Sequence, residues 1–226
     1  MIKIRRNADR GYAHFGWLES RHTFSFGSYF DPEQMGVSEL RVANDDLLHP
    51  GASLDPVRQQ DMEIISYVLD GQAQHQDSLG NNIKLAARSV QVLSSGSGAQ
   101  YTEHNTSTDK NLNLLQYWVV PNRSGTAPAY QSSRIPMKDG VTLLVSPDGQ
   151  DNSLKVQQQL FLYQLKLNNS SHGLAESANG FLQVLKGDVE FNGSFLQQGD
   201  CAIIEDEPIL TVHALGRAEL LYFSLP

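Results

Sequence analysis

Short stretches of alternating apolar and polar residues recur along the whole chain, and this pattern constrains the fold most. A stretch such as Tyr163-Gln164-Leu165-Lys166-Leu167 places its apolar side chains on one face only, as in a half-buried β-strand. Turn sequences such as Asp70-Gly71 and Asn192-Gly193 separate the stretches. No amphipathic helical segment longer than about ten residues is present. The sequence therefore predicts an all-β protein.

The expected strands follow one another closely from one end of the chain to the other. They span residues 22–26, 40–43, 63–69, 73–77, 90–93, 112–120, 141–146, 159–167, 180–186, 189–191, 202–205, 209–214 and 219–223. A single helical turn is expected at residues 151–154.

Two features predict two domains. The length of 226 residues suits two domains of roughly 100 residues, although length alone also allows one large β domain. The segment Tyr67–Ala73 resembles Gln183–Val189, since in each an apolar strand meets a glycine turn and a second strand leaves. Residues 122–136 are polar and rich in Pro, Gly and Ser, as in a linker. We therefore expect an N-terminal barrel over 1–121 and a C-terminal barrel over 137–226.

The net charge is −8 and the pI about 5.3, so the chain has no general attraction for nucleic acid or anionic lipid. The one basic cluster along the sequence is Lys3, Arg5 and Arg6. The single cysteine, Cys201, excludes an intramolecular disulfide and fits a reducing compartment. No signal-peptide pattern and no apolar run of the ~20 residues needed for a membrane span is present. We expect a cytoplasmic protein with no nucleic-acid or membrane partner.

One stretch keeps the frame of a cupin motif. Many cupin barrels carry Gly, five residues, His-x-His, a short gap, Glu and a later Gly. Here Gly51 precedes Val57-Arg58-Gln59, then Glu63 and Gly71, so both histidine positions have changed. In the second cupin motif, Tyr101 stands where a histidine belongs and Asn105 occupies the matching Asn position.

With these residues in view, the chain resembles the pirin family over most of residues 11–121. The resemblance rests on stretches such as Ser20-Arg21-His22-Thr23-Phe24-Ser25-Phe26-Gly27, Asn44-Asp45-Asp46, Asp61-Met62-Glu63-Ile64, His75-Gln76-Asp77-Ser78-Leu79-Gly80-Asn81 and Glu103-His104-Asn105. In the second half it is looser, through Ser146-Pro147-Asp148-Gly149 and Gly199-Asp200. The resemblance implies two tandem cupin-type β-barrels, a bicupin, and is greatest to the metal-free, YhaK-type branch.

The resemblance also implies a candidate pocket. Metal-binding pirins use two histidines from the first motif, with a histidine and a glutamate from the second. The matching positions here hold Val57, Gln59, Tyr101 and Glu103, so only Glu103 fits. Val57 has no donor atom, and a lone carboxylate does not hold a transition metal tightly. We expect no cofactor; a metal, if bound, would be iron or another divalent transition metal.

Structural roles are expected for the other polar residues near these motifs. His104 and His75 are the histidines that could replace the lost metal ligands, but if Glu103 faces inward, strand alternation turns His104 outward. We expect hydrogen-bonding roles for Asp45, Asp46, Glu63 and His22, and a buried, inert Cys201. Five aromatic residues are candidates for lining a pocket but are expected mainly in core and interdomain packing: Trp17, Phe24, Phe26, Tyr29 and Phe30.

Three functions remain open, and the sequence identifies no catalytic residue. The first is a non-enzymatic regulatory or stress-related protein that binds a small molecule or a protein. The second, implied by the resemblance of some pirins to quercetin 2,3-dioxygenases, is an oxidoreductase that opens a flavonol ring with O2. The third is a metal-independent enzyme with Tyr101 and Glu103 as acid–base groups.

Overall fold

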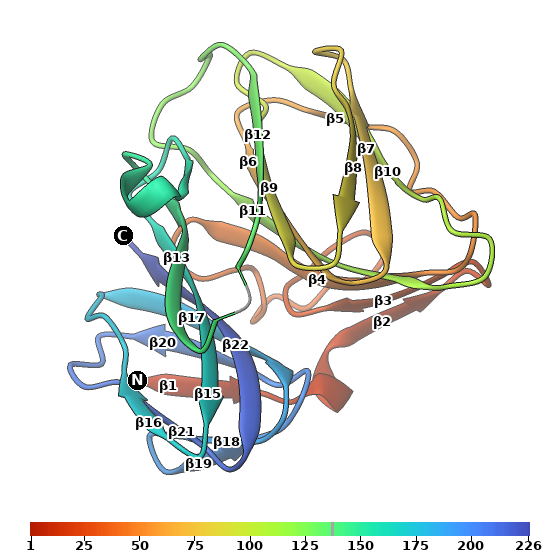
Figure 1. The fold of residues 1–226 in the computed structure, drawn as a ribbon. Coiled ribbons are helices and arrows are strands. Elements are labelled where there is room, and N and C mark those ends of the chain that lie inside the picture. The colour runs from red at the N-terminus through yellow and green to blue at the C-terminus, as the bar shows by residue number, and fades with distance from the viewer. Residues whose placement is uncertain (137) are drawn as a thin grey trace.

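The computed structural model describes residues 1–136 and 138–226, and its regular structure is almost entirely β-strand. The strands form two barrels that lie one above the other (Figure 1). Each barrel combines one seven-stranded sheet with one four-stranded sheet. The predicted all-β, two-barrel architecture is therefore confirmed.

The first barrel holds most of the N-terminal half. Its large sheet has the order β12 (Ala129–Arg134), β9 (Ser89–Ser94), β6 (Glu63–Asp70), β11 (Leu112–Val119), β4 (Leu40–Leu48), β3 (Leu18–His22) and β2 (Gly11–His14). Its small sheet has the order β5 (Val57–Gln59), β10 (Ala99–Asn105), β7 (Gln72–Asp77) and β8 (Asn82–Ala86). The inner faces of these two sheets enclose the barrel interior.

The second barrel repeats this plan. Its large sheet has the order β1 (Ile2–Arg5), β20 (Cys201–Glu205), β17 (Asn179–Lys186), β22 (Arg217–Leu225), β15 (Phe161–Asn168), β13 (Gly140–Ser146) and β14 (Leu154–Lys155). Its small sheet has the order β16 (Ser171–Gly173), β21 (Thr211–Ala214), β18 (Val189–Phe191) and β19 (Ser194–Leu196). Two 3-10 turns complete the structure: η1 (Asn7–Asp9) and η2 (Gln150–Asn152), the latter close to the predicted helical turn.

Two strands depart from the domain bounds that the sequence suggested. Strand β1 begins the chain but pairs with β20, so it belongs to the second barrel. Strand β12 lies within residues 122–136, the expected linker, and pairs with β9 over six residues. Its sequence, Ala-Tyr-Gln-Ser-Ser-Arg, is too polar to predict a strand. Most of its residues are exposed, as is common for a strand at a sheet edge.

The predicted strand over residues 22–26 is wrong at its C-terminal end. Strand β3 ends at His22, and the chain then turns through Ser25 and Phe26 into a loop. Phe26 and Tyr29 form an isolated bridge there. This loop therefore leaves the sheet and covers one end of the first barrel's interior.

The internal repeat appears as two matching hairpins. Gly71 joins β6 to β7, and Gly187 joins β17 to β18. Both have positive φ, 85° and 78°. An added Cβ would lie 2.5 Å from the carbonyl oxygen of Asn111 at Gly71 and 2.2 Å from that of Arg217 at Gly187. Both turns therefore require glycine for the same reason, a close approach of a neighbouring strand.

The largest hydrophobic core lies between the barrels, where the two seven-stranded sheets face each other. Phe24 and Tyr117 of the first barrel pack there against Phe181 and Phe223 of the second. The Tyr117 hydroxyl donates a hydrogen bond to Gln183 Oε1 at 2.7 Å. The two barrels consequently share one buried interface.

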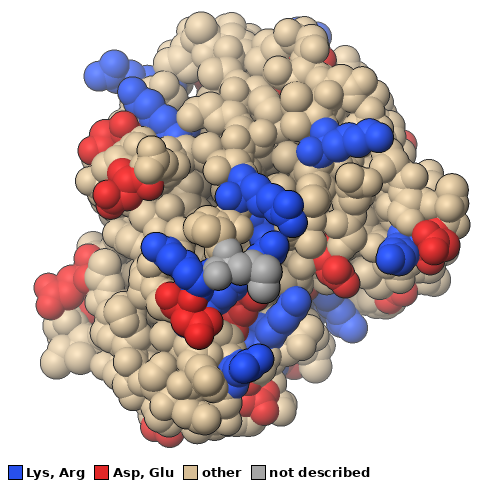
Figure 2. Space-filling view, viewed as in Figure 1, with Lys and Arg blue, Asp and Glu red and all other residues tan. Residues whose placement is uncertain are grey.

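Among the described residues, no helix is long and apolar enough to span a bilayer. Figure 2 shows basic side chains gathered near the seam between the barrels, although the chain as a whole is acidic. In the second barrel, Lys166 and Lys186 both lie opposite Glu219, on the two strands that flank β22.

Candidate functional site

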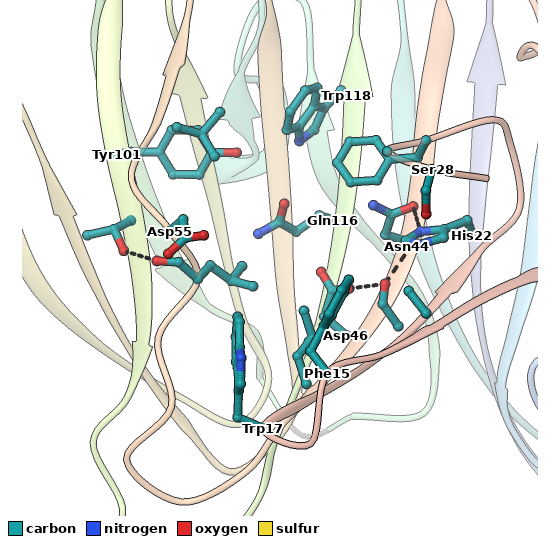
Figure 3. Close-up of a pocket in the computed structure, with 18 residues that line it drawn as sticks. Phe15, Trp17, His22, Ser28, Asn44, Asp46, Asp55, Tyr101, Gln116 and Trp118 are labelled. Atoms are coloured by element: carbon teal, nitrogen blue, oxygen red, sulfur yellow. Dashed lines mark hydrogen bonds between the residues drawn. The ribbon is translucent and has the colours of Figure 1, made fainter. Parts of the chain in front are cut away.

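A pocket of about 330 Å³ lies in the first barrel, between its large sheet, strands β5 and β10, and the loop after β3 (Figure 3). We call it the first-barrel pocket. Its volume is at the lower end of the roughly 300–1,000 Å³ found for small-molecule sites.

Aromatic side chains form the walls of the first-barrel pocket. Phe15 and Trp17 stack on one side, with ring centroids 6.4 Å apart. Phe26 and Trp118 meet edge to face on the other side, with centroids 5.5 Å apart. Tyr101 of β10 lies on the side of the pocket opposite Ser28 and His22, close to Asp55 (Figure 3). Both tryptophans of the chain therefore line this one pocket.

Polar side chains form its floor, and strand register explains why they converge. Ser20 pairs with Asp46 across β3 and β4, and His22 pairs with Asn44 one step along the same face. Asn44 in turn pairs with Gln116 of β11. Because alternate residues of a strand share a face, all five side chains point to the barrel interior. All are at most 6% exposed.

Hydrogen bonds tie most of the floor together. Ser20 Oγ donates to Asp46 Oδ1 at 2.5 Å, and His22 Nδ1 lies 2.9 Å from Asn44 Oδ1. Burial raises the pKa of Asp46 to about 7, an effect that the Ser20 hydrogen bond only partly offsets. Burial lowers the pKa of His22. The floor therefore contains a carboxyl group that changes charge near neutral pH beside a neutral imidazole.

Two donor groups of the pocket are left without a partner. Gln116 is 4% exposed, and its Nε2 makes no hydrogen bond within the described residues. The Trp118 indole N–H lies near enough to the Tyr101 hydroxyl to lower its pKa slightly, but it makes no hydrogen bond of acceptable geometry. Gln116 Nε2 and Trp118 Nε1 are therefore buried donors without an acceptor among the described residues, which is uncommon in folded proteins.

The four positions that match the metal ligands of metal-binding pirins lie in two different environments. Val57 and Tyr101 pair across β5 and β10, and both line the first-barrel pocket. Gln59 pairs with Ala99 and does not reach the pocket lining. Glu103 is fully buried deeper in the barrel and does not line the pocket either. The acid–base pair of Tyr101 and Glu103 that the sequence suggested is therefore not assembled in this pocket.

Glu103 belongs instead to a buried cluster around His75. The two ring nitrogens of His75 lie 2.8 Å from Glu103 Oε1 and 3.1 Å from Asp77 Oδ2. The Tyr130 ring stacks on the imidazole at 4.5 Å. Burial alone would lower the pKa of His75, but the two carboxylates outweigh it and the net shift is upward. Both nitrogens of His75 are thus engaged.

The donor set does not fit the family's metal. Val57 supplies no ligand atom, and burial strongly raises the pKa of the Tyr101 phenol, which would have to ionise to bind a metal well. Glu103 Oε1 already accepts a hydrogen bond from Gln91 as well as contacting His75. His104 points to the opposite face of β10 and lines a surface groove. No group of three or more His, Cys, Asp or Glu within 1–136 and 138–226 is arranged to hold a metal.

The aromatic residues are divided between interdomain packing, which the sequence favoured, and the pocket lining, which it left as the alternative. Phe24 packs between the barrels as expected. Trp17 and Phe26 instead line the pocket, and Phe30 is 71% exposed. The loop after β3 explains the positions of Phe26 and Phe30, because it turns away from the interdomain core after Phe24.

The expected structural residues lie as predicted. Glu63 accepts hydrogen bonds from Ser94 and the backbone of Gln157. Cys201 is fully buried, and burial raises the pKa of its thiol. Asp45 points away from the pocket, with Oδ2 4.0 Å from Arg10. Its neighbour Asp46 has a hydrogen-bonding role as expected, but it also forms part of the pocket floor, which the sequence did not reveal.

The fold and the pocket define a bicupin whose first barrel holds the candidate site. The pirin family model matches residues 3–119, and a quercetinase C-terminal cupin domain model matches residues 143–225. The chain belongs to the pirin family.

Its relatives include a protein of Escherichia coli named quercetin 2,3-dioxygenase, 42% identical over 229 residues that cover 100% of this chain and 99% of that protein. The crystal structure of YhhW from Escherichia coli has a TM-score of 0.96 at 41% identity, covering 100% of this chain and 98% of that one. A YhhW structure in complex with nickel(II) has the same TM-score at 40% identity, covering 100% of this chain and 99% of that one.

Similarity to YhaK is lower than similarity to the relatives described above. The pirin-like protein YhaK of Escherichia coli is 34% identical over 235 residues, covering all of both chains. Its crystal structure has a TM-score of 0.76, covering 96% of this chain and 98% of that one. The expected place in the YhaK-type branch is therefore not confirmed.

Proposed function

We propose that this protein binds a planar aromatic small molecule in the first-barrel pocket, without a metal at the family's metal position. The observation that carries the proposal is the pocket itself, with aromatic walls above a buried polar floor. Aromatic walls favour a flat ring, and a few polar groups fix its orientation. Binding would serve a regulatory or stress-related role rather than catalysis.

Quercetin is the first ligand to test, because relatives carry the name quercetin 2,3-dioxygenase. Tryptophan fluorescence reports binding directly, since Trp17 and Trp118 both line the pocket. Titration without oxygen is expected to give saturable quenching with one site per chain.

A matched pair of variants locates that binding. Phe15→Ala removes an exposed ring at the pocket, whereas Phe195→Ala removes an exposed ring on the second barrel. Loss of one stacking contact is worth about 1 kcal/mol, so Phe15→Ala is expected to weaken binding about fivefold. Phe195→Ala is expected to change nothing. Absence of saturable quenching, or equal effects of the two variants, would refute the proposal.

Oxidation of quercetin is the second candidate, favoured by the names of the relatives and by the nickel(II) complex of YhhW. It is tested by following quercetin in air with added nickel(II), iron(II) or neither. Turnover that disappears in Glu103→Ala would favour this candidate over simple binding.

A further inference from the structure

We infer that the first-barrel pocket selects flat aromatic ligands that carry a positive charge, and that Asp46 supplies the opposite charge. The ligand class is a heteroaromatic cation, such as a ring system with a quaternary nitrogen. The inference rests on the proposed function and extends it, because it names the charge of the ligand and the residue that recognises this charge.

The lining of the pocket carries only negative charge. Its ionisable side chains are Asp46, Asp55, His22 and Tyr101, and no lysine or arginine is among the described residues that line it. Burial lowers the pKa of His22 and strongly raises that of Tyr101, so both side chains are neutral near pH 7. Asp55 is exposed at the mouth, where water screens its charge. Asp46 is therefore the charged group that a bound ligand meets inside the pocket.

Asp46 offers the pocket an unused carboxylate oxygen. Its Oδ1 accepts the Ser20 hydroxyl, whereas its Oδ2 makes no hydrogen bond with the residues that the structure describes. Unlike Gln116 Nε2 and Glu103 Oε2, this oxygen is not among the fully enclosed atoms without a partner. Asp46 lines the pocket and lies near the centre of its side chains (Figure 3). A ligand in the pocket therefore reaches Oδ2.

Asp46 lacks a close counter-charge in the protein. The charge of Arg10 acts on it, but Arg10 lies 4.0 Å from Asp45 Oδ2, on the opposite face of β4. Burial outweighs this effect and raises the pKa of Asp46 to about 7, because a carboxylate is costly to remove from water without a cation beside it. A positively charged ligand next to Oδ2 supplies that cation, whereas a negatively charged ligand is repelled.

The aromatic walls favour the same charge. The face of an aromatic ring attracts a cation within about 6 Å of the ring centroid, and tryptophan does so most strongly. Five aromatic residues line the pocket: Phe15, Trp17, Phe26, Tyr101 and Trp118. These walls also hold a neutral flat ring, so the charge of the ligand is the property that Asp46 adds to recognition.

The test compares three ligands of similar shape and different charge. N-methylquinolinium is positive, 1-methylnaphthalene is neutral and 1-naphthoate is negative. Dissociation constants are measured by isothermal titration calorimetry at about pH 8, where Asp46, with a pKa of about 7, is mainly ionised. The wild-type protein is expected to bind the cation about tenfold more tightly than the neutral compound, and the anion most weakly.

Matched variants assign the preference to Asp46. Asp46→Asn removes the charge but keeps the size of the side chain and an acceptor for Ser20. It is expected to reduce the preference for the cation to under about threefold, the part that the aromatic walls retain, and to leave the affinity for the neutral compound within about twofold. Asp45→Asn removes the same charge from the opposite face of β4 and is expected to keep the full preference.

The outcomes separate this inference from the proposed function. If the neutral compound or the anion binds as tightly as the cation, or if Asp46→Asn keeps the full preference, the inference is wrong although the pocket still binds aromatic compounds. If none of the three binds but quercetin does, the inference is again wrong and the proposed function stands. If no aromatic compound binds, both fail. The comparison on the wild-type protein does not depend on the folding of a variant.

Discussion

Asp45 and Asp46 are adjacent in sequence but have different surroundings. Asp45 faces Arg10 on one side of β4, whereas Asp46 faces the pocket on the other. Burial dominates the pKa of Asp46, raising it to about 7; the nearby charge of Asp45 adds to this effect, while Ser20 and Arg10 oppose it. The two aspartates therefore have different surroundings because strand alternation places them on opposite faces of β4.

The raised pKa of Asp46 makes the free energy of unfolding depend on pH. The pKa of this carboxyl group is about 3.8 in the unfolded chain and about 7 in the folded chain. Its contribution to the free energy of unfolding therefore decreases as the pH rises from 3.8 to 7 and stays constant at higher pH. The full difference corresponds to at most ~4 kcal/mol. Relative to wild type, the free energy of unfolding of Asp46→Asn is expected to increase by about 1–4 kcal/mol as the pH is raised from 4 to 7, measured by urea unfolding. A stability difference between the two proteins that is the same at every pH would contradict this.

Some individual residues of the first-barrel pocket could be predicted from the sequence. It singled out Val57 and Tyr101, which line the pocket, because the resemblance marked their positions. It did not find Gln116, which no motif marks. The available signal was polar residues within otherwise apolar strands, Asn44 and Asp46 in 40–48 and Gln116 in 112–119. The strand register is needed to tell which of these residues face inward.

At the scale of elements, strands β5 and β10 carry the lost ligand positions. Val57 lies opposite Tyr101, and the side chains at 57, 59, 101 and 103 share one face. The frame of a metal site is thus retained while the donors have changed.

Restoring the donors should restore a metal site. The triple variant Val57→His, Gln59→His and Tyr101→His, with the native Glu103, is expected to bind about one nickel(II) per chain, because strand alternation turns three imidazoles and one carboxylate to the same face. The wild-type protein is expected to bind none in the same calorimetric titration.

The control places histidines on the outer face of the same strands. Arg58 and Gln100 also pair across β5 and β10, so Arg58→His with Gln100→His tests unspecific binding by histidine. Equal nickel(II) binding by this control and the triple variant would show that the inward frame is not responsible.

Strand existence was easier to predict than strand partners. Alternation located β6, β15 and β17 closely, because each buries a strongly apolar face. It did not predict β1, whose partner β20 lies about 200 positions away, nor short strands such as β2, β5 and β8. It missed β12 because a polar edge strand resembles a linker.

At the scale of the whole molecule, the shared core makes the two barrels one cooperative unit. Residues of both barrels form the largest hydrophobic cluster, and β1 crosses from one half of the chain to the other. Tyr67 of the first barrel also donates to Glu219 Oε1 of the second at 2.7 Å. Thermal unfolding should therefore show one transition.

Tyr117→Phe tests this coupling. It removes the hydroxyl that donates to Gln183 across the interface and leaves a buried amide oxygen unpaired. The expected cost is about 1–3 kcal/mol, which lowers the single Tm by roughly 2–10 °C. Separate transitions of the two barrels in calorimetry, with only one of them shifted, would show that the barrels unfold independently.

The central claim is that side chains, and not a metal, hold the ligand in the first-barrel pocket. The most direct measurement is the dissociation constant of quercetin, determined without oxygen, for protein treated with EDTA and for untreated protein. The account predicts the same value for both within about twofold, and an unchanged value after nickel(II) is restored. Binding that is lost on EDTA treatment and regained with nickel(II) would contradict it.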